Sequence, residues 1–346
     1  MALPLPSFYN PANVVNDTRW INYMELQEAA LAWRKQHGLR ASATDRLKVG
    51  LLIIDAQNTF CHPMGELFVG GMSGTGAVDD SVRTVEFIYR NLGVISNLEF
   101  TLDTHRAYAV FHPSFLIDEN GSHPAPFTEI KNADVKAGKW LVNPFAARAI
   151  GVSYPYLTQH LEDYTARLEA AGRYGLTIWP YHGMIGDKGH ALVSGLAEAA
   201  FFHATARGAQ TGLHVKGTHP LVENYSILGP EVTQLFDGTP IQRNTEILQQ
   251  LEQFDIVVIA GQAKSHCVAW TIDDFLVQLT AKDPSLAQKV YLLEDCMTPI
   301  VVKAPDGSVV FDYTPGTDAA FKRFRDAGMH IVQSTTPIQD WPGIGL

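Results

Sequence analysis

Continuous apolar runs alternate with amphipathic segments along most of the chain. The apolar runs, which are typical of strands buried on both faces, lie at 49–54, 95–102, 213–215, 255–260, 289–293 and 330–333. Segments with helical spacing lie at 20–37, 78–91, 190–206, 245–253, 265–280 and 318–327. Strands that alternate with helices predict a doubly wound α/β fold, with a mostly parallel six-stranded sheet and helices on both of its faces.

Two segments fall outside this alternation. Residues 1–46 form a predicted N-terminal extension, and residues 47–346 form the predicted main domain. Within the main domain, residues from about 116 to 177 form a predicted insertion that contains one helix-like piece at 156–171. A long insertion beside a site is typical of a lid or of a subunit contact, and both roles stay open at this point.

The amino-acid composition limits the class of protein and its partners, but it does not indicate a reaction. With 46% hydrophobic and 18% charged residues among 346, the chain can bury a sizeable core. A net charge of −10 without a dense cluster of lysine and arginine argues against nucleic-acid and anionic-membrane partners. The chain has 3 cysteines, no signal-peptide pattern over residues 1–11 and no apolar run long enough for a bilayer, so we expect a cytoplasmic protein.

Polar and potentially reactive residues follow four of the predicted strands. Asp55, Asp103 and Lys216 each stand directly after an apolar run, and Cys267 lies a short turn beyond the run at 255–260. Sites of open parallel sheets form at the carboxyl ends of the strands, so we expect these four side chains to meet at one rim. The competing interpretations are a structural Asp–Lys ion pair at the sheet edge and a small core cysteine.

The segment 261–267 leads from a predicted buried strand into a helix and ends at Cys267. A cysteine in the first turn of a helix meets the positive end of the helix dipole, which favours the thiolate. Main-chain N–H groups of the same turn can hold an oxyanion. Lys216 beside a thiol would stabilise the thiolate, and Asp55 could carry a proton to a leaving amine. The other two cysteines lack such a turn, so we interpret both as core residues.

One carboxylate and two imidazoles follow the second predicted strand. Asp103 and His105 can face one ion, because alternate residues of an extended chain share a face, and His112 follows closely. His182, after a further short apolar run, is another candidate ligand. Ligation by histidine and carboxylate suits zinc, iron or manganese. Hydrogen-bonded loop histidines are the competing interpretation, because 13 histidines make some clustering expected.

Five short motifs occur in order at the predicted strand ends. They are D-A-Q-N-T-F at 55–60, D-T-H at 103–105 with H-P-S-F at 112–115, W-P-Y-H at 179–182, V-K-G at 215–217 with E-N-Y-S at 223–226, and G-Q-A-K-S-H-C-V at 261–268. Together, over roughly residues 48–335, they resemble the motifs of the nicotinamidases within the isochorismatase-like cysteine hydrolase superfamily. The resemblance implies the isochorismatase-like hydrolase fold.

The resemblance also implies a reaction. It implies a cysteine amidohydrolase that cleaves a small primary amide through a thioester, with Cys267 as nucleophile and Asp55 and Lys216 as its catalytic partners. It further implies a cis peptide bond between Gln262 and Ala263, and an oxyanion hole formed by the N–H groups of Ala263 and Cys267.

Substrate and metal contacts are implied in the same way. The implied substrate-binding residues are Phe60, Trp179 and Gln262. The implied ligands of one divalent metal ion are Asp103, His105, His112 and His182. Zinc is the expected ion, with iron and manganese as the alternatives. We expect a small-molecule amide as the partner and a homo-oligomeric protein.

Departures from the family pattern leave the substrate open. Gly183 stands where family members often carry cysteine, the run after it differs, and the insertion at 116–177 is far longer than the family's usual link. A same-family hydrolase of an N-formyl or maleamic-type, ureido or larger amide would fit the same motifs. A hydrolase in which metal-bound water attacks, and a non-catalytic binding protein on the same scaffold, also stay open.

Overall fold

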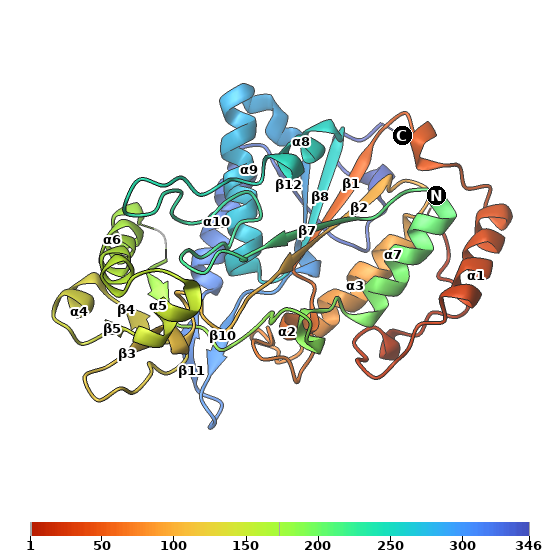
Figure 1. The fold of residues 1–346 in the computed structure, drawn as a ribbon. Helices are drawn as coiled ribbons and strands as arrows, with labels where there is room; N and C mark the ends of the chain where they lie inside the picture. The colour runs from red at the N-terminus through yellow and green to blue at the C-terminus, as the bar shows by residue number, and fades with distance from the viewer. Residues whose placement is uncertain (1, 173, 346) are drawn as a thin grey trace.

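The computed structural model describes residues 2–172 and 174–345, and a six-stranded sheet forms its centre (Figure 1). The strands are β1 (Val49–Ile54), β2 (Asn97–Asp103), β7 (Gly212–Lys216), β8 (Ile256–Gly261), β9 (Val290–Leu293) and β12 (His330–Val332). They lie in the order β12-β9-β8-β1-β2-β7, and every neighbouring pair is parallel. The predicted α/β class and the six predicted strands are confirmed, and the sheet is wholly rather than mostly parallel.

Helices cover both faces of this sheet (Figure 1). One face carries α3 (Gly76–Arg90) and α7 (Ser194–Arg207), which pack against each other. The other face carries α8 (Thr245–Gln253), α9 (Ala269–Lys282) and α10 (Thr314–Asp326). A parallel sheet needs cover on both faces, and β1 is accordingly buried at every position. This burial explains why its sequence is a continuous apolar run instead of an alternating one.

The N-terminal segment packs on the sheet domain. Its helix α1 (Tyr23–Gln36) lies against α7 and buries Leu26 and Ala30. The chain before α1 also touches α7, because the main-chain N–H of Gly195 donates to the carbonyl of Val14 at 2.9 Å. The segment therefore adds a third helix to one face of the molecule.

Residues 116–172 and 174–177 form a compact group of small elements, which Figure 1 shows gathered beside the six-stranded sheet. The elements are β3 (Leu116–Ile117), β4 (Glu129–Ile130), α4 (Asn132–Lys136), β5 (Leu141–Val142), α5 (Pro144–Ile150), α6 (Tyr154–Ala171) and β6 (Leu176–Thr177). β3 pairs with β5 and β4 with β6, both antiparallel. α6 contains the helix predicted at 156–171, whereas strands of two residues are too short to show a periodic pattern.

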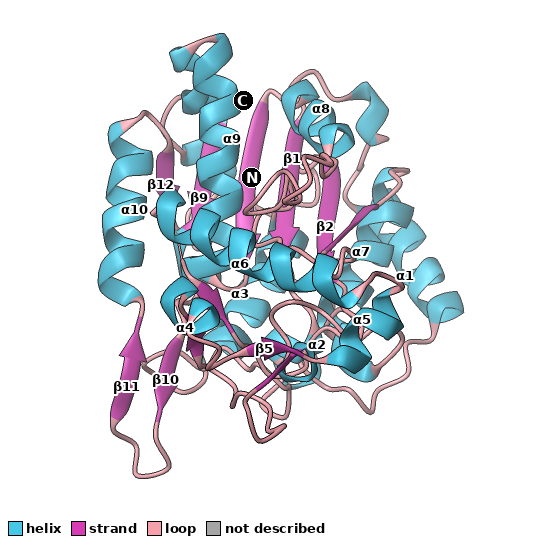
Figure 2. Cartoon of the chain, turned by 60° about the vertical axis from the view of Figure 1, so that its left-hand side comes forward, coloured by secondary structure: helices cyan, strands magenta, loops and turns pink. Residues whose placement is uncertain are grey.

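A hairpin and a short helix complete the fold. β10 (Val301–Lys303) and β11 (Val309–Asp312) pair antiparallel and project from the body (Figure 2). The helix α2 (Asn58–Cys61) follows the end of β1. Within the described residues, no helix combines the length and the apolar character needed to cross a membrane.

Leu26→Ala should lower the free energy of unfolding by about 2–4 kcal/mol, because it deletes a side chain that is 6% exposed between α1 and α7. Leu31→Ala is the matched control on the same helix, and its side chain is 47% exposed, so the change should stay below about 0.5 kcal/mol. Urea unfolding followed by circular dichroism measures both variants. Equal effects would show that α1 does not pack on α7 as described.

Candidate active site

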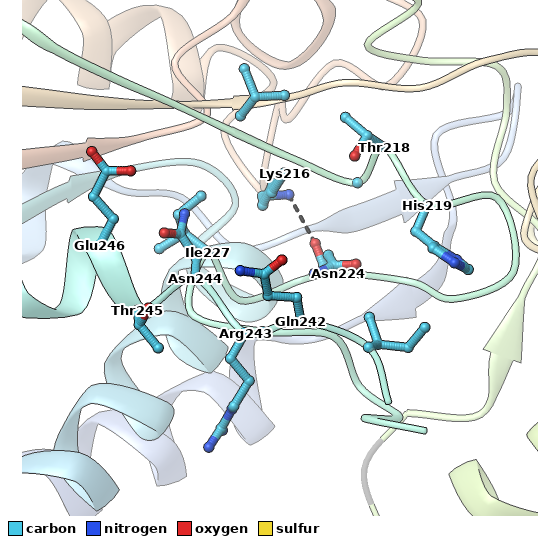
Figure 3. A pocket seen from close by; sticks show the side chains of 14 residues that line it. Lys216, Thr218, His219, Asn224, Ile227, Gln242, Arg243, Asn244, Thr245 and Glu246 are labelled. Carbon is cyan, nitrogen blue, oxygen red and sulfur yellow. Dashed lines mark hydrogen bonds between the residues drawn. The ribbon is translucent and has the colours of Figure 1, made fainter. Parts of the chain in front are cut away.

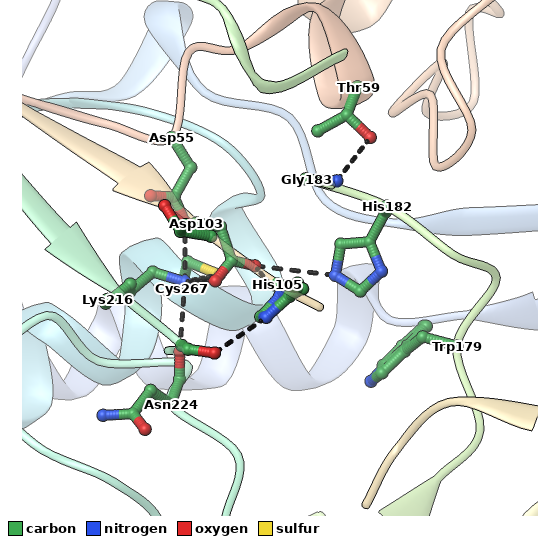
Figure 4. A network of polar contacts seen from close by, with 12 residues as sticks. Asp55, Thr59, Asp103, His105, Trp179, His182, Gly183, Lys216, Asn224 and Cys267 are labelled. Atoms are coloured by element: carbon green, nitrogen blue, oxygen red, sulfur yellow. Dashed lines mark hydrogen bonds and ion pairs between the residues drawn. The ribbon is translucent and has the colours of Figure 1, made fainter. Parts of the chain in front are cut away.

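The carboxyl ends of three neighbouring strands and the turn after a fourth converge at one rim. Asp55 follows β1, while Asp103 and Lys216 end β2 and β7 and are partners in the strand register. β8 pairs with β1 up to Gly261 and leads into the turn that carries Cys267. The structure thus brings together the four residues that the sequence places after strands, and all four side chains are buried (Figure 4).

The ammonium group of Lys216 lies at the centre of this cluster. Its Nζ atom lies 2.9 Å from Asp55 Oδ2, 2.9 Å from Asp103 Oδ1 and 3.5 Å from Cys267 Sγ. It also donates a hydrogen bond of 3.0 Å to the carbonyl oxygen of Asn224 (Figure 3). Burial acts to lower the pKa of Lys216, but Asp103 and Asp55 outweigh it and hold this pKa well above its ordinary value. Lys216 therefore stays cationic.

Asp55 is fixed by its neighbour strand and by its own backbone. The Asp55 N–H donates to Thr101 Oγ1 at 3.0 Å, and the Thr101 hydroxyl donates to Asp55 Oδ1 at 2.5 Å. The backbone φ of Asp55 is 46°, in the left-handed region that non-glycine residues adopt at a cost of about 1–3 kcal/mol. Burial raises the pKa of Asp55, although the Lys216 ammonium acts in the opposite direction. Its carboxyl group is therefore suited to exchange a proton.

Cys267 lies in a π-helical turn, Lys264–Val268, directly before α9. Its sulfur and one oxygen each of Asp55 and Asp103 lie within 4.8 Å of one another. Burial raises the pKa of Cys267 well above its ordinary value, while the Lys216 ammonium lowers it. The sequence pattern favours a thiolate through the helix dipole. In the structure, desolvation outweighs the effect of the Lys216 ammonium on this pKa.

The turn before Cys267 presents a free main-chain donor. The peptide bond between Gln262 and Ala263 is cis, as the family resemblance implies. Ala263 lines the same cavity as Cys267, and within the described chain no acceptor is bonded to its N–H. The Gln262 side chain does not line this cavity and donates to Asp80 at 2.8 Å instead. The side chain of Gln262 is therefore held by Asp80, and its contact with substrate stays a prediction.

The cavity that Cys267 lines is narrow. Its volume is about 20 Å³, which is roughly the room that one water molecule needs. Phe60 and Trp179, the predicted aromatic contacts, form part of its wall. A larger polar cavity of about 300 Å³ adjoins Lys216 (Figure 3), but Cys267 does not line it. The chemistry therefore belongs to the smaller cavity, and a substrate has to move side chains when it binds.

Several wall residues lie outside the predicted set of substrate contacts. Leu67, Glu223, Tyr225, His266 and Ile300 also line the cavity. His266 stands next to Cys267 in the sequence, so its position could have been inferred from the turn. Leu67 and Ile300 come from loops without a periodic pattern, and no comparable signal in the sequence points to them.

The insertion forms a fixed wall behind the cavity. Tyr174 donates from its hydroxyl to the Ser265 carbonyl at 3.0 Å and stacks on the His266 ring at a centroid distance of 4.6 Å. On α6, the Tyr164 hydroxyl accepts a hydrogen bond of 2.9 Å from the Glu223 N–H. The insertion is thus bonded to both the nucleophile turn and the 223–225 segment, which favours a supporting role over that of a hinged lid.

Three imidazoles beside Asp103 share one hydrogen-bonding pattern. In His105, His112 and His182, the Nδ1 atom is bonded to a backbone carbonyl, which can only accept. Each Nδ1 therefore carries a proton, and in the neutral ring each Nε2 offers its lone pair to a cation, as in metal-ligating histidines. The carbonyl groups are those of Gly217, Arg106 and Pro180, at 3.0, 3.0 and 2.7 Å respectively.

These lone pairs converge on a carboxylate. His105 Nε2 and His182 Nε2 lie 2.9 and 3.5 Å from Asp103 Oδ2, so the three atoms are close enough to contact one cation. His112 lies outside this tight triad, but its ring centroid is 5.6 and 5.8 Å from the other two, and its buried Nε2 has no hydrogen-bond partner in the described chain. Burial lowers the pKa of His182, and lowers that of His112 to about 3, which keeps both imidazoles neutral. The residues fit a divalent metal ion.

Gly217 closes the space between this cluster and Lys216. Its φ is 74°, and a Cβ atom there would lie 2.4 Å from His105 Cε1 and 2.7 Å from Asp103 Oδ1. Only glycine leaves room for the ring and the carboxylate at this position. The glycine after Lys216 is therefore a requirement of the site geometry.

Comparison with known proteins gives structural neighbours only. No family model matches the chain, and no curated protein matches it significantly. The nicotinamidase/pyrazinamidase of Acinetobacter baumanii is 19% identical, covers 84% of this chain and 99% of its own, with a TM-score of 0.48. The yeast nicotinamidase is 15% identical and covers 82% of this chain and 99% of its own, with a TM-score of 0.47. The pyrazinamidase of Pyrococcus horikoshii, in complex with zinc, is 18% identical and covers 83% of this chain and 99% of its own, with a TM-score of 0.41. At these values the matches assign neither a substrate nor a metal to this chain.

Purified protein should contain close to one equivalent of a divalent transition metal. His105→Ala and His182→Ala should each lose most of it, because each removes a lone pair directed at Asp103 Oδ2. His62→Ala, a histidine outside this cluster, is the control and should keep the metal. Elemental analysis after dialysis measures the wild type and the three variants. Unchanged metal in both cluster variants would contradict the ligand assignment.

Gly217→Ala should lose bound metal and lower the melting temperature, because the new methyl group overlaps His105 and Asp103. Gly238→Ala is the matched control: its φ is 84°, but nothing lies within 4 Å of the added Cβ atom. Only backbone strain of about 1 kcal/mol is expected there. Metal analysis and thermal unfolding compare the two variants, and equal metal contents would contradict the described packing.

Proposed function

We propose that this chain is a cysteine amidohydrolase that converts a small primary amide into a carboxylate and ammonia. One observation supports this reaction most directly: the Cys267 sulfur lies 3.5 Å from the Lys216 ammonium and within 4.8 Å of an Asp55 carboxylate oxygen, and Cys267 lines a small cavity. A nucleophile, a base and a fixed positive charge are the groups that acyl transfer through sulfur requires.

In the first half of the reaction, Cys267 transfers its proton to Asp55 as the sulfur attacks the amide carbon. The Lys216 ammonium, 3.5 Å from the sulfur, stabilises the anion that forms. The N–H groups of Ala263 and Cys267 donate to the oxyanion of the tetrahedral intermediate, at about 3–4 kcal/mol per donor. Asp55 then gives the proton to the leaving nitrogen. Ammonia departs as the carbon–nitrogen bond breaks, and a thioester remains.

In the second half, Asp55 acts as the general base. Its carboxylate takes a proton from a water molecule, whose oxygen attacks the thioester carbon. The carbon–sulfur bond then breaks, and the proton returns to the sulfur of Cys267. The products are the carboxylic acid and the resting thiol, so the cycle consumes one amide and one water. The raised pKa of Asp55 suits both directions of this transfer.

Asp103, His105, His182 and His112 would hold a divalent ion, for which zinc, iron and manganese are the candidates. When bound, such an ion supplies a Lewis acid that positions and polarises a donor atom of the substrate. The protein residues keep their own roles: Asp103 faces both Lys216 and the imidazoles, and so it ties the catalytic cluster to this set.

The substrate is proposed to be small and flat. Phe60 and Trp179 both line the narrow cavity, where they can contact the two faces of a ring. Nicotinamide and pyrazinamide are the first candidates, because the chain carries motifs that resemble those of nicotinamidases, and its structural neighbours are named as nicotinamidases and pyrazinamidases. N-formyl, maleamic-type, ureido and larger amides are the alternatives within the same reaction.

An ammonia-release assay over a panel of primary amides, with nicotinamide included, tests the proposal. Cys267→Ala should lower turnover by at least roughly 10³-fold, because no other group in the cavity can form the thioester. Cys296→Ala is the control, since this buried cysteine does not line the cavity and its loss should leave turnover within about threefold. Near-normal turnover by Cys267→Ala in the presence of metal would instead favour attack by metal-bound water.

A further inference from the structure

Asp80 on α3 is a buried carboxylate that the proposed reaction does not use. Its side chain is 3% exposed, and it does not line the cavity of Cys267. Three donors reach it: Gln262 Nε2 at 2.8 Å, Thr298 Oγ1 at 2.6 Å and Arg83 Nη2 at 2.7 Å. The first two donors belong to segments that are far from α3 in the sequence, so Asp80 joins three parts of the chain.

The same contacts surround residues 262–264, the turn that contains Ala263. Gln262 precedes Ala263, and its side chain is held by Asp80. Lys264 follows Ala263, and its N–H donates to the carbonyl of Thr298 at 2.9 Å. Thr298 in turn donates through its hydroxyl to Asp80 and through its N–H to Gln262 Oε1, the latter at 3.4 Å. The residues on both sides of Ala263 are thus tied, directly or through Thr298, to one carboxylate.

The orientation of Ala263 matters because its N–H is the free donor of the cavity wall. The Gln262 N–H is already bonded to the carbonyl of Ile54 at 2.8 Å, so the β1 side of the turn is fixed by the sheet. The opposite side depends on the contacts of Gln262 and Thr298 with Asp80. If that side shifts, the Ala263 N–H moves relative to the sulfur of Cys267.

We propose that Asp80 is a positioning residue of the oxyanion hole, which holds Gln262 and Thr298 so that the Ala263 N–H stays directed at the developing oxyanion. This inference rests on the proposed function. A carboxylate suits the task because it accepts from all three donors and donates to none. Gln262 and Thr298 share one oxygen of Asp80, and Arg83 bonds the other. Asparagine has nearly the same volume, but it removes the charge from the shared oxygen and turns an NH₂ group either on Arg83 or on the other two donors. Asp80→Asn therefore weakens the contacts without opening a cavity.

Kinetics separate positioning from plain structural support. In Asp80→Asn, kcat should fall by roughly 10–100-fold while KM changes by less than about threefold, because the oxyanion exists only after attack. Asp79→Asn, the neighbour on the same helix, is the matched control and should behave as wild type. A variant that unfolds more easily but keeps its kcat below its unfolding temperature would overturn the proposal.

A second measurement does not need turnover. Nicotinaldehyde adds reversibly to a thiol and places an oxyanion where the amide would, so it should protect Cys267 from iodoacetamide. Asp80→Asn should need roughly 10–100-fold more aldehyde for equal protection, while the alkylation rate without aldehyde stays within about threefold. Equal protection in both proteins would overturn the proposal.

If Asp80→Asn does not fold, Thr298→Val replaces it in both measurements, since valine keeps the shape and removes the hydroxyl donor to Asp80. The same direction of change is expected, and unchanged kcat with unchanged protection would overturn the proposal. A wild-type protein that releases ammonia from no amide would refute the proposed function. In that case, protection of wild-type Cys267 by the aldehyde would show that the oxyanion site is still formed, and its comparison with Asp80→Asn would decide the role of Asp80.

Discussion

One buried ammonium between two buried carboxylates holds the rim of this sheet together. An ion taken out of water without a partner costs several kcal/mol, and here Lys216 offsets the charges of Asp55 and Asp103 at 2.9 Å each. Asp103 uses one oxygen for Lys216 and directs the other at His105. Asp103 therefore couples two groups of residues, because a change in the charge of the histidine cluster also alters the charge that Lys216 has to balance beside Cys267.

The order of the strands in the sheet brings these charged residues and Cys267 to one place. β8, β1, β2 and β7 are consecutive in the sheet, so the residues at their carboxyl ends arrive in one row although they are distant in sequence. Supports come from outside the sheet: Asp80 from α3, and Tyr174 and Tyr164 from the insertion. The sheet supplies the reactive groups, and the segments around it fix their directions.

The sequence predicts the sheet well because strands buried on both faces are continuously apolar. All six runs overlap strands, although the edge strands β7 and β12 are only partly buried. Rules about strand ends and short motifs suffice to place Asp55, Asp103, Lys216 and Cys267 at one rim. Side-chain directions within a turn do not follow from such rules. The motif accordingly predicts Gln262 at the substrate, whereas its side chain is bonded to Asp80. The contact of Thr101 with Asp55 likewise lies inside a strand whose pattern shows only burial.

The left-handed backbone of Asp55 restricts which residues this position can hold, apart from any chemistry. Aspartate, asparagine and glycine visit that conformation readily, whereas most other residues are strained in it. Of the two possible replacements for aspartate, only asparagine keeps the size and shape of the side chain. A single nucleotide change converts an aspartate codon into an asparagine codon, so the shortest evolutionary route out of proton transfer at this position keeps the backbone conformation but removes one of the two charges that Lys216 balances.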